Sequence, residues 1–337
     1  MKSIVCTEPY KLTYREVEKP KIKETEVLIK VKAIGICGTD IHAFTGHQPF
    51  FDYPRVLGHE VCGEVTELGK QITKFKVGEQ VALIPYVSCN SCPSCLSGRT
   101  NCCENISVIG VHENGGFGEY LAIPESNVLP VGNIDSITAS LIEPYAISAH
   151  AVRRAAVQPR ENILVVGAGP IGLGVAAIAK ADGANVVVAD TSPERRNHVQ
   201  NVLGLATIDP SHENTEASIR SNFSGYLAQK VIDATGSARA MNNAVNLICN
   251  GGTIVFVGLF KGNLEFSDPD FHKKETTMMG SRNATPEDFS KVVRLMKSGD
   301  LSSEMMLTHK FDFLDIADNF NEQVVGNKDL LKGVIVL

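Results

Sequence analysis

The strongest constraint on the fold is a glycine fingerprint placed directly after a short apolar run. Residues 162–166 read Asn-Ile-Leu-Val-Val, which is typical of a buried parallel strand, and the pattern Gly167-x-Gly169-x-x-Gly172 follows at once. The alanine-rich residues 173–180 then predict a helix. Strand, glycine turn and helix in this order form a phosphate-binding unit, because free backbone N–H groups at the helix start attract a pyrophosphate.

A carboxylate completes the fingerprint. The apolar run 185–189 ends at Asp190, which can accept hydrogen bonds from the adenosine ribose of a dinucleotide and would repel the 2′-phosphate of NADP. The sequence therefore predicts NAD as the cofactor. NADP is the alternative, because Arg195 and Arg196 follow closely, although a solvated helix face explains Arg196 better. The predicted cofactor-binding residues are Gly167, Gly169, Pro170, Ile171, Gly172, Asp190 and Arg195.

The second half of the chain alternates strand-like runs with helical or loop segments. This alternation predicts a doubly wound parallel sheet, and six strands match two mononucleotide-binding halves. The runs cover residues 162–167, 185–190, 206–209, 230–234, 253–258 and 276–281.

The first part of the chain has a different pattern. Short strand-like runs at 26–33, 63–68 and 80–85, punctuated by glycines, predict a β-rich domain with long connections. A helix expected around 144–157 marks the boundary between the two patterns. We expect another helix at 286–298 and a final strand at 333–337, which the residues alone assign to neither domain.

Composition excludes several classes of function. The 337-residue chain is 43% hydrophobic and 21% charged, which is typical of a globular protein large enough for two domains. A formal net charge of −6 provides no basic surface for nucleic acid or an anionic membrane. The sequence has neither the apolar stretch of a signal peptide nor a membrane span, so we expect a cytoplasmic protein.

One loop carries four cysteines at metal-ligand spacing. Cys89-x-x-Cys92-x-x-Cys95 is followed by Cys103, and four thiolates fill the tetrahedral shell of zinc, so this site is expected to be structural. Cys102 is adjacent, which leaves the identity of the last ligand open.

A second set of ligand-type residues is dispersed along the chain. Cys37, His59, Glu60 and Glu143 would supply a thiolate, an imidazole and carboxylates, and three such ligands leave a position on zinc for a substrate hydroxyl. Considered singly, each has an ordinary structural explanation: a core thiol, a satisfied buried histidine or a carboxylate at a helix start.

Together these motifs resemble those of the zinc-containing medium-chain dehydrogenases. Cys37-Gly-Thr39-Asp40-x-His42, Gly58-His59-Glu60, the four-cysteine loop and the downstream fingerprint occur in the family's order over essentially the whole chain. The pattern of Glu60 and Glu143 is similar to that of the sorbitol, threonine and sugar-acid dehydrogenases. Residues 54–60, 142–144, 148–154 and 272–283 resemble the sugar-acid branch most, which implies oxidation of L-galactonate at C5 to D-tagaturonate.

The resemblance also implies an architecture. It implies a GroES-like catalytic domain over 1–146, a Rossmann NAD-binding domain over 147–285 and a C-terminal segment, 286–337, that folds back onto the catalytic domain. It further implies a homodimer or homotetramer built through the nucleotide-binding domain, with one catalytic and one structural zinc ion per chain.

Individual roles follow from the same resemblance. Cys37, His59 and Glu60 would hold the catalytic zinc, with Glu143 either a ligand or the partner of zinc-bound water, and Thr39 and His42 would relay the proton. At most one glutamate is expected on zinc with substrate present, because a thiolate and two carboxylates already exceed its charge.

Arg282 is the candidate for binding a substrate carboxylate, since arginine pairs with carboxylates through two parallel hydrogen bonds; an interdomain ion pair is the alternative. Four further residues are candidates for lining the substrate pocket, although aromatic residues near turns more often belong to the core. They are His47, Phe50, Phe51 and Phe117.

Three other interpretations compete with this one. A catalytically silent zinc-binding module would explain the four cysteines but not the fingerprint with Asp190. An NADPH-dependent quinone or enone reductase of the same fold would need no zinc, which leaves Cys37, His59 and Glu60 without a role. Within the zinc family, a threonine, polyol or sugar-phosphate dehydrogenase is the alternative to a sugar-acid dehydrogenase.

Overall fold

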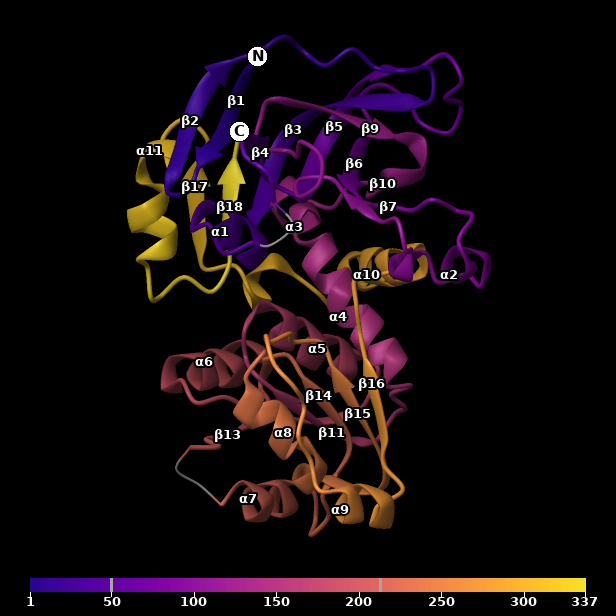
Figure 1. Ribbon diagram of the computed structural model, residues 1–337, viewed down its shortest axis with the longest axis vertical. Coiled ribbons are helices and arrows are strands. Elements are labelled where there is room, and N and C mark those ends of the chain that lie inside the picture. The colour runs from indigo at the N-terminus through magenta and orange to yellow at the C-terminus, as the bar shows by residue number, and fades with distance from the viewer. Residues whose placement is uncertain (49–50, 212–213) are drawn as a thin grey trace. The chain divides into compact units, whose positions relative to one another are not determined.

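The computed structural model describes residues 1–48, 51–211 and 214–337 (Figure 1). These residues form two compact units, which we describe separately. Unit 1 comprises Met1–Glu143, Thr285–Val293 and Leu307–Leu337, and unit 2 comprises Pro144–Ala284 and Arg294–Met306. Within the described ranges no helix is both long and apolar enough to cross a membrane.

Unit 1 is organised around one large sheet with the strand order β10-β6-β5-β3-β18-β17, and β9 also pairs with β3. The C-terminal strand β18 lies antiparallel to β3, with Val334 opposite Gly35, so that the end of the chain reaches the segment just before Cys37. The strands are β3 (Glu26–Ile36), β5 (Glu60–Leu68), β6 (Gln80–Leu83), β9 (Tyr120–Pro124), β10 (Val128–Pro130), β17 (His309–Asp312) and β18 (Gly333–Val336).

A three-stranded sheet, β2-β1-β4, and the two-stranded ribbon β7-β8 complete the β structure of this unit. The ribbon closes the base of the four-cysteine loop, because β7 precedes Cys89 and β8 follows Cys103. The remaining elements are β1 (Lys2–Glu8), β2 (Lys11–Glu16), β4 (Arg55–Val56), β7 (Tyr86–Val87), β8 (Ser107–Val108), α1 (Gly38–Phe44), α2 (Pro93–Leu96), α3 (Ser136–Ser140), α11 (Ile316–Phe320) and the short turns η1 (Thr100–Cys102), η2 (Glu125–Asn127) and η5 (Asn321–Val325).

The core of unit 1 takes up two of the aromatic residues considered for the substrate pocket. Phe51 and Phe117 are buried in a cluster with Phe44 and Phe320, so the interpretation of these aromatics as core residues is the right one for this pair. His47 is exposed, with its Nδ1 3.0 Å from the hydroxyl of Thr45. Phe50 lies outside the described residues.

Unit 2 contains the parallel sheet that the strand pattern predicts. Its order is β13-β12-β11-β14-β15-β16, and all paired strands are parallel. The order reverses between β11 and β14, and such a reversal opens a ligand crevice at the carboxyl ends of the strands. The strands are β11 (Asn162–Val166), β12 (Asn185–Ala189), β13 (Ala206–Ile208), β14 (Ala228–Asp233), β15 (Ile248–Phe256) and β16 (Thr277–Gly280).

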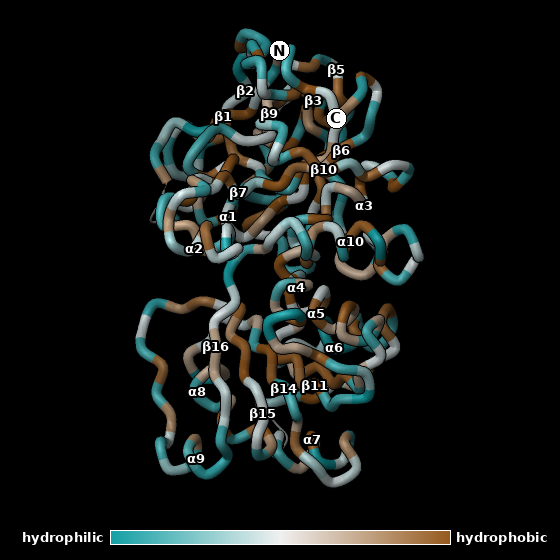
Figure 2. The backbone as a smooth tube through the Cα atoms, turned by 90° about the vertical axis from the view of Figure 1, so that its right-hand side faces the viewer, coloured by the Kyte–Doolittle hydropathy of each residue, from teal (hydrophilic) through white to brown (hydrophobic). Residues whose placement is uncertain are grey.

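One strand starts earlier than the sequence indicates. The predicted run begins at residue 253, whereas β15 begins at Ile248, and its register against β14 shifts between these two residues. The central strand β11 is hydrophobic and buried along most of its length (Figure 2). The helical elements of this unit are α5 (Pro170–Ala181), α6 (Pro193–His198), α7 (Thr215–Asn222), α8 (Ala238–Leu247), α9 (Asp268–Lys273), η3 (Val199–Leu203) and η4 (Ser303–Met305).

Two longer helices are each divided between the units. They are α4 (Ile142–Arg154), whose first two residues belong to unit 1, and α10 (Pro286–Ser298), whose last five residues belong to unit 2. The two parts expected from the sequence, a β-rich unit and a unit with a doubly wound parallel sheet, are both present.

Candidate functional site

Three ligand-type residues from two strand ends converge in unit 1. Cys37, His59 and Glu60 each offer one ligand atom, and these three atoms lie within 4.8 Å of one another. Cys37 follows β3, and the other two residues stand at the start of the neighbouring strand β5, where Glu60 lies opposite Gly35. A Cβ atom at Gly35 would collide with the Glu60 carboxylate, so this glycine makes room for the side chain.

Asp40 holds the two segments of this cluster together. It is completely buried, and its carboxylate accepts hydrogen bonds from the backbone N–H groups of Cys37 at 2.8 Å and Gly58 at 3.1 Å. Its Oδ1 also lies 3.7 Å from Nδ1 of His59. A carboxylate behind a histidine is the arrangement that orients imidazole ligands at metal sites. The sequence places Asp40 in a motif but does not reveal this role.

A buried lysine is the second residue that the sequence did not identify. Lys332 is 3% exposed, and its ammonium donates to Oε1 of Glu60 at 2.5 Å and to the carbonyl of Ile36 at 2.9 Å. Burial alone would lower the pKa of Lys332, but the negative charges of Glu60 and Cys37 raise it above the usual value. A single lysine before an apolar strand carries no sequence signal of such a contact.

Glu143 lies near the cluster without belonging to the group of three. It is 3% exposed, and one carboxylate oxygen, Oε1, accepts the hydroxyl of Tyr86. Burial is the main cause that raises the pKa of Glu143; the negative charge of Glu60 adds to the rise, and His59 opposes it. Glu143 is therefore close enough to both residues to feel their charges.

The donor atoms fit a divalent metal ion. Among the described residues, Oε2 of Glu60 and Oε2 of Glu143 are buried without a hydrogen-bond partner, which leaves a carboxylate oxygen of each available to a metal ion. Burial by itself would lower the pKa of His59, yet the negative charges of Cys37 and Asp40 beside the ring raise it well above its usual value. One thiolate, one imidazole and one carboxylate form a donor set that zinc accepts, with a position left open.

The proposed relay residues lie on α1, the helix that begins beside Cys37. Thr39 is half-buried and His42 is exposed, and they stand three positions apart (i, i+3), so they share one face of the helix. This face of the helix therefore runs from the half-buried Thr39, near Cys37, to the exposed His42.

The four-cysteine loop forms a second cluster. Sγ atoms of Cys89, Cys92, Cys95 and Cys103 lie within 4.8 Å of one another, whereas Cys102 is exposed and is not in the group. The backbone N–H of Cys89 donates to Sγ of Cys103 at 3.2 Å. Hydrogen bonds from Ser91 lower the pKa of Cys89 to about 5, and a thiolate is the form that binds zinc.

The glycine fingerprint has the geometry that a pyrophosphate requires. Gly167 has a φ of +96°, which suits the tight turn, and a Cβ atom at Gly172 would collide with the carbonyl of Gly167. A Cβ atom at Gly169 would meet nothing within 4 Å, so the approach to the helix start is open. Pro170 and Ile171 form the first turn of α5. The chain's own atoms therefore leave space where the fingerprint predicts a ligand.

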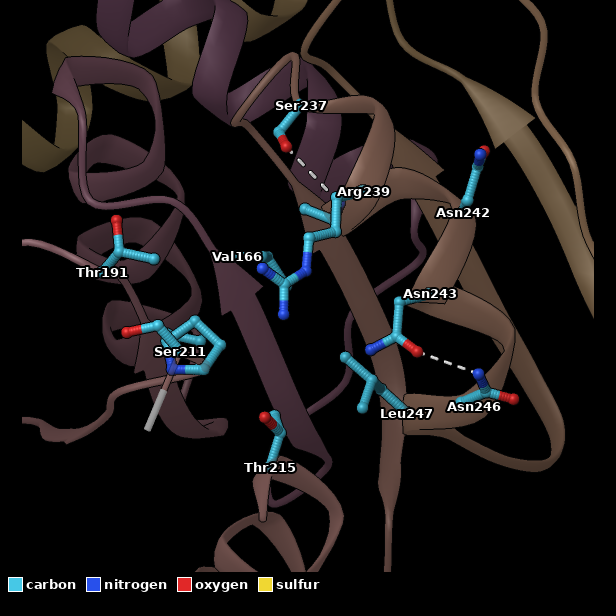
Figure 3. A pocket seen from close by; sticks show the side chains of 13 residues that line it. Val166, Thr191, Ser211, Thr215, Ser237, Arg239, Asn242, Asn243, Asn246 and Leu247 are labelled. Atoms are coloured by element: carbon cyan, nitrogen blue, oxygen red, sulfur yellow. Dashed lines mark hydrogen bonds between the residues drawn. The ribbon is translucent and has the colours of Figure 1, made fainter. Parts of the chain in front are cut away.

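A pocket of about 640 Å³ lies at the carboxyl ends of the strands in unit 2. Figure 3 shows the side chain of Arg239, from α8, pointing into it, with Thr191 and Ser211 on the opposite wall. No sequence motif points to Arg239, because its place at the start of a helix gives no sign of the pocket. The lining consists of Val166, Ala189, Thr191, Pro210, Ser211, Thr215, Ser237, Arg239, Ala240, Asn242, Asn243, Asn246 and Leu247.

Asp190 lies between the pocket residues Ala189 and Thr191. Its carboxylate accepts the N–H of Ala168, within the glycine turn, at 2.6 Å and the N–H of Ser192 at 2.8 Å. Arg195 is half-exposed, with its guanidinium 3.9 Å from Oδ2 of Asp190.

The prediction for Arg196 was wrong. It does not lie on a solvated helix face: its guanidinium bonds to the Asp209 carboxylate at 2.9 Å and to the Asp190 carbonyl at 2.7 Å. Arg282, the candidate for binding a carboxylate, is exposed and follows the end of β16.

Two family models match the chain. The alcohol dehydrogenase GroES-like domain matches residues 23–133, and the zinc-binding dehydrogenase model matches residues 170–298. The chain is 64% identical over 335 residues to L-galactonate-5-dehydrogenase of Escherichia coli K12, which covers 99% of this chain and 98% of the relative.

Several solved structures have nearly the same fold as this chain. An alcohol dehydrogenase from Escherichia coli CFT073 in complex with NADH superimposes with a TM-score of 0.93 at 33% identity, covering 100% of this chain and 99% of that one. A zinc-binding dehydrogenase from Sinorhizobium meliloti bound to NADP also gives 0.93, at 27% identity and with the same coverage.

Proposed function

The chain belongs to the zinc-dependent medium-chain alcohol dehydrogenases, and on that premise we propose that it oxidises the C5 hydroxyl of L-galactonate to D-tagaturonate with NAD. It is an oxidoreductase that acts on a CH–OH group. The observation that supports this substrate assignment is the 64% identity to L-galactonate-5-dehydrogenase over nearly the whole of both chains.

The cofactor assignment has support from the site itself. The open approach at Gly169 leaves room for a pyrophosphate, and the carboxylate of Asp190, between the pocket residues Ala189 and Thr191, favours a dinucleotide without a 2′-phosphate. Arg195 is the residue through which NADP would bind instead, since its guanidinium is half-exposed next to Asp190. Activity with NADP at or above the level with NAD would overturn the choice.

We assign the catalytic zinc to Cys37, His59 and Glu60, and the structural zinc to Cys89, Cys92, Cys95 and Cys103. Zinc in the first cluster supplies a Lewis acid that lowers the pKa of the substrate hydroxyl, and NAD supplies the hydride acceptor. Asp40 orients His59, and Lys332 offsets the charge of Glu60. Glu60 belongs to the three-residue group, and we assign Glu143, whose Oε2 is also buried without a partner, as the carboxylate that meets zinc or its bound water when no substrate is present.

The substrate proton leaves along α1 in this proposal, from Thr39 to His42. Replacing His42 by glutamine should lower kcat by about tenfold or more and shift its pH dependence, because an amide cannot carry a proton near neutral pH. The pH–rate profile is the measurement. His47→Gln removes another exposed histidine a few residues away and serves as the control. A profile for His42→Gln that overlays the parent's would exclude His42 from the relay.

The substrate is tested by following NADH formation with purified, zinc-loaded protein. L-galactonate, L-idonate, L-threonine, sorbitol and galactitol 1-phosphate are compared at equal concentration, each with NAD and with NADP. A dominant rate with L-galactonate supports the proposal. A dominant rate with another compound would support the same enzyme class but contradict L-galactonate as the substrate.

Arg282 is the proposed partner of the substrate carboxylate. Arg282→Ala should raise the KM for L-galactonate by about tenfold, the value of one charge-assisted contact, and leave the KM for any uncharged polyol substrate unchanged. Equal KM values for L-galactonate in the variant and the parent would remove this role.

We also propose a homodimer formed through β16. This strand ends the parallel sheet and, among the described strands, pairs only with β15. Large apolar side chains lie exposed in the segment that connects β15 to α9: Leu259 is 91% exposed, Leu264 39% and Phe266 43%. Two such edges can pair about a twofold axis and bury these side chains. Light scattering that gives the mass of one chain at micromolar concentration would contradict this assembly.

A cytoplasmic location fits the cysteines. All nine are free, and four of them are grouped for a metal rather than paired in disulfides. Fractionation of cells that express the tagged chain tests the location, and recovery outside the cytoplasmic fraction would contradict it.

A further inference from the structure

Tyr86 joins the two clusters of unit 1, although nothing in the sequence assigns it a function. It lies on β7, three residues before Cys89, and its backbone pairs with Val108 on β8, beyond the last cysteine of the loop. The base of the four-cysteine loop is therefore the strand that carries this tyrosine.

The hydroxyl of Tyr86 donates to Oε1 of Glu143, a residue outside the four-cysteine loop. Its ring packs edge-on against Phe289, which is completely buried, with 6.2 Å between ring centroids. The backbone carbonyl of Tyr86 accepts a hydrogen bond from Nδ2 of the buried Asn127 at 3.1 Å. Ring and backbone are thus both fixed, and the hydroxyl has a defined direction.

This contact gives the two carboxylate oxygens of Glu143 different surroundings. Oε1 is occupied by Tyr86, whereas Oε2 is buried and has no partner. Glu60 shows the same division, with Lys332 on Oε1 and no partner for Oε2. Each glutamate is left with one free oxygen, but Lys332 is a cation and Tyr86 a neutral donor.

We propose that Tyr86 is a positioning residue that fixes which oxygen of Glu143 faces the metal cluster, and that it thereby transmits the order of the four-cysteine loop to the catalytic centre. The inference rests on the assignment of zinc to Cys37, His59 and Glu60. It does not depend on the identity of the substrate. In this proposal the structural metal does more than order its own loop. The strand at the base of that loop, β7, carries Tyr86, which donates the hydrogen bond to Glu143.

Tyr86→Phe keeps the ring and removes the hydroxyl. Residues that orient metal ligands typically change metal affinity by about tenfold to a hundredfold when replaced. We expect the affinity for the more weakly held zinc ion, measured by competition with a chromophoric chelator, to fall by about tenfold. The visible spectrum of cobalt in the catalytic cluster should change as well.

Tyr14→Phe is the matched control. The hydroxyl of Tyr14 also makes two hydrogen bonds in unit 1, donating to the carbonyl of Phe313 at 2.8 Å and accepting the N–H of Ala317 at 3.2 Å. Its loss should lower the unfolding temperature without changing the affinity for zinc. A loss of zinc affinity in both variants would show that the effect of Tyr86 is general destabilisation and would overturn the proposal.

A double-mutant cycle tests whether Tyr86 acts through Glu143. In Glu143→Gln the amide oxygen still accepts the tyrosine hydroxyl, but the second position no longer offers a carboxylate oxygen. Adding Tyr86→Phe to this variant should cost no further zinc affinity, since interacting residues are non-additive. Full additivity, or parent-like affinity of Tyr86→Phe alone, would overturn the proposal. Zinc affinity is measured without substrate, so this result is independent of the L-galactonate assay.

Discussion

Cys103→Ser should lose one of about two zinc ions per chain and unfold at a much lower temperature, whereas Cys102→Ser should match the parent protein. The reason lies in how little else holds the four-cysteine loop. Among the residues that the structure describes, Ile106, which is half-buried, is the one residue besides the cysteines in the buried cluster of the loop, and the loop's helical elements are single turns. A metal that orders such a loop contributes its binding energy to folding.

The size of the effect follows from this argument. A loss of about 4 kcal/mol would lower the unfolding temperature by about 10 °C, since each kcal/mol shifts a chain of this size by about 2–4 °C. Metal analysis and a thermal melt measure both quantities. Cys102 is the control that the chain itself provides, because it is exposed one position away from a buried ligand. Loss of zinc from Cys102→Ser, with Cys103→Ser intact, would reverse the ligand assignment.

Lys332→Met should destabilise the zinc-free protein by about 3–5 kcal/mol, because it leaves the buried carboxylate of Glu60 without its counter-ion. Both groups are inaccessible, at 3% and 0% of the side-chain surface, so water cannot replace the lysine. Methionine has nearly the same length, and the substitution therefore tests the charge rather than the packing. The zinc-loaded protein should lose less, since the ion offsets the same carboxylate.

Urea unfolding of the protein with and without a chelator measures this difference. Lys332→Arg keeps the positive charge and should recover most of the lost stability. Lys310→Met, at an exposed position on β17, controls for the removal of a lysine from the same sheet. Equal stability of Lys332→Met and the parent in the presence of chelator would show that the ion pair contributes no net stability.

Much of the fold could be predicted from the sequence because its signals are local. The fingerprint from residue 162 to Gly172, the helix at 286–298 and the strand that ends before Asp190 are read from neighbouring residues, and the structure has all three. The start of β15 could not be read in this way, because it depends on the pairing of Ile248 with Ala228 of β14, a contact between segments that are not neighbours in the chain.

The candidate ligands were also accessible from the sequence, because their residue types and spacing are characteristic of zinc chemistry. His59 and Glu60 are adjacent in the chain, and the four cysteines lie within one loop. That chemistry could not decide between Cys102 and Cys103, which have the same side chain. The structure separates them by burial, since only Cys103 turns its sulfur toward the other three.

The sequence by itself determined the two-domain fold class, the dinucleotide fingerprint and the kinds of ligand, since each depends on residue type and short spacing. Only the tertiary structure decided which distant groups control those ligands. Lys332 reaches Glu60 because β18 pairs with β3 in one register, and Tyr86 reaches Glu143 because β7 pairs with β8 and packs against Phe289. Such contacts join residues far apart in the chain, and the pairing and packing that create them are properties of the whole unit rather than of any local pattern.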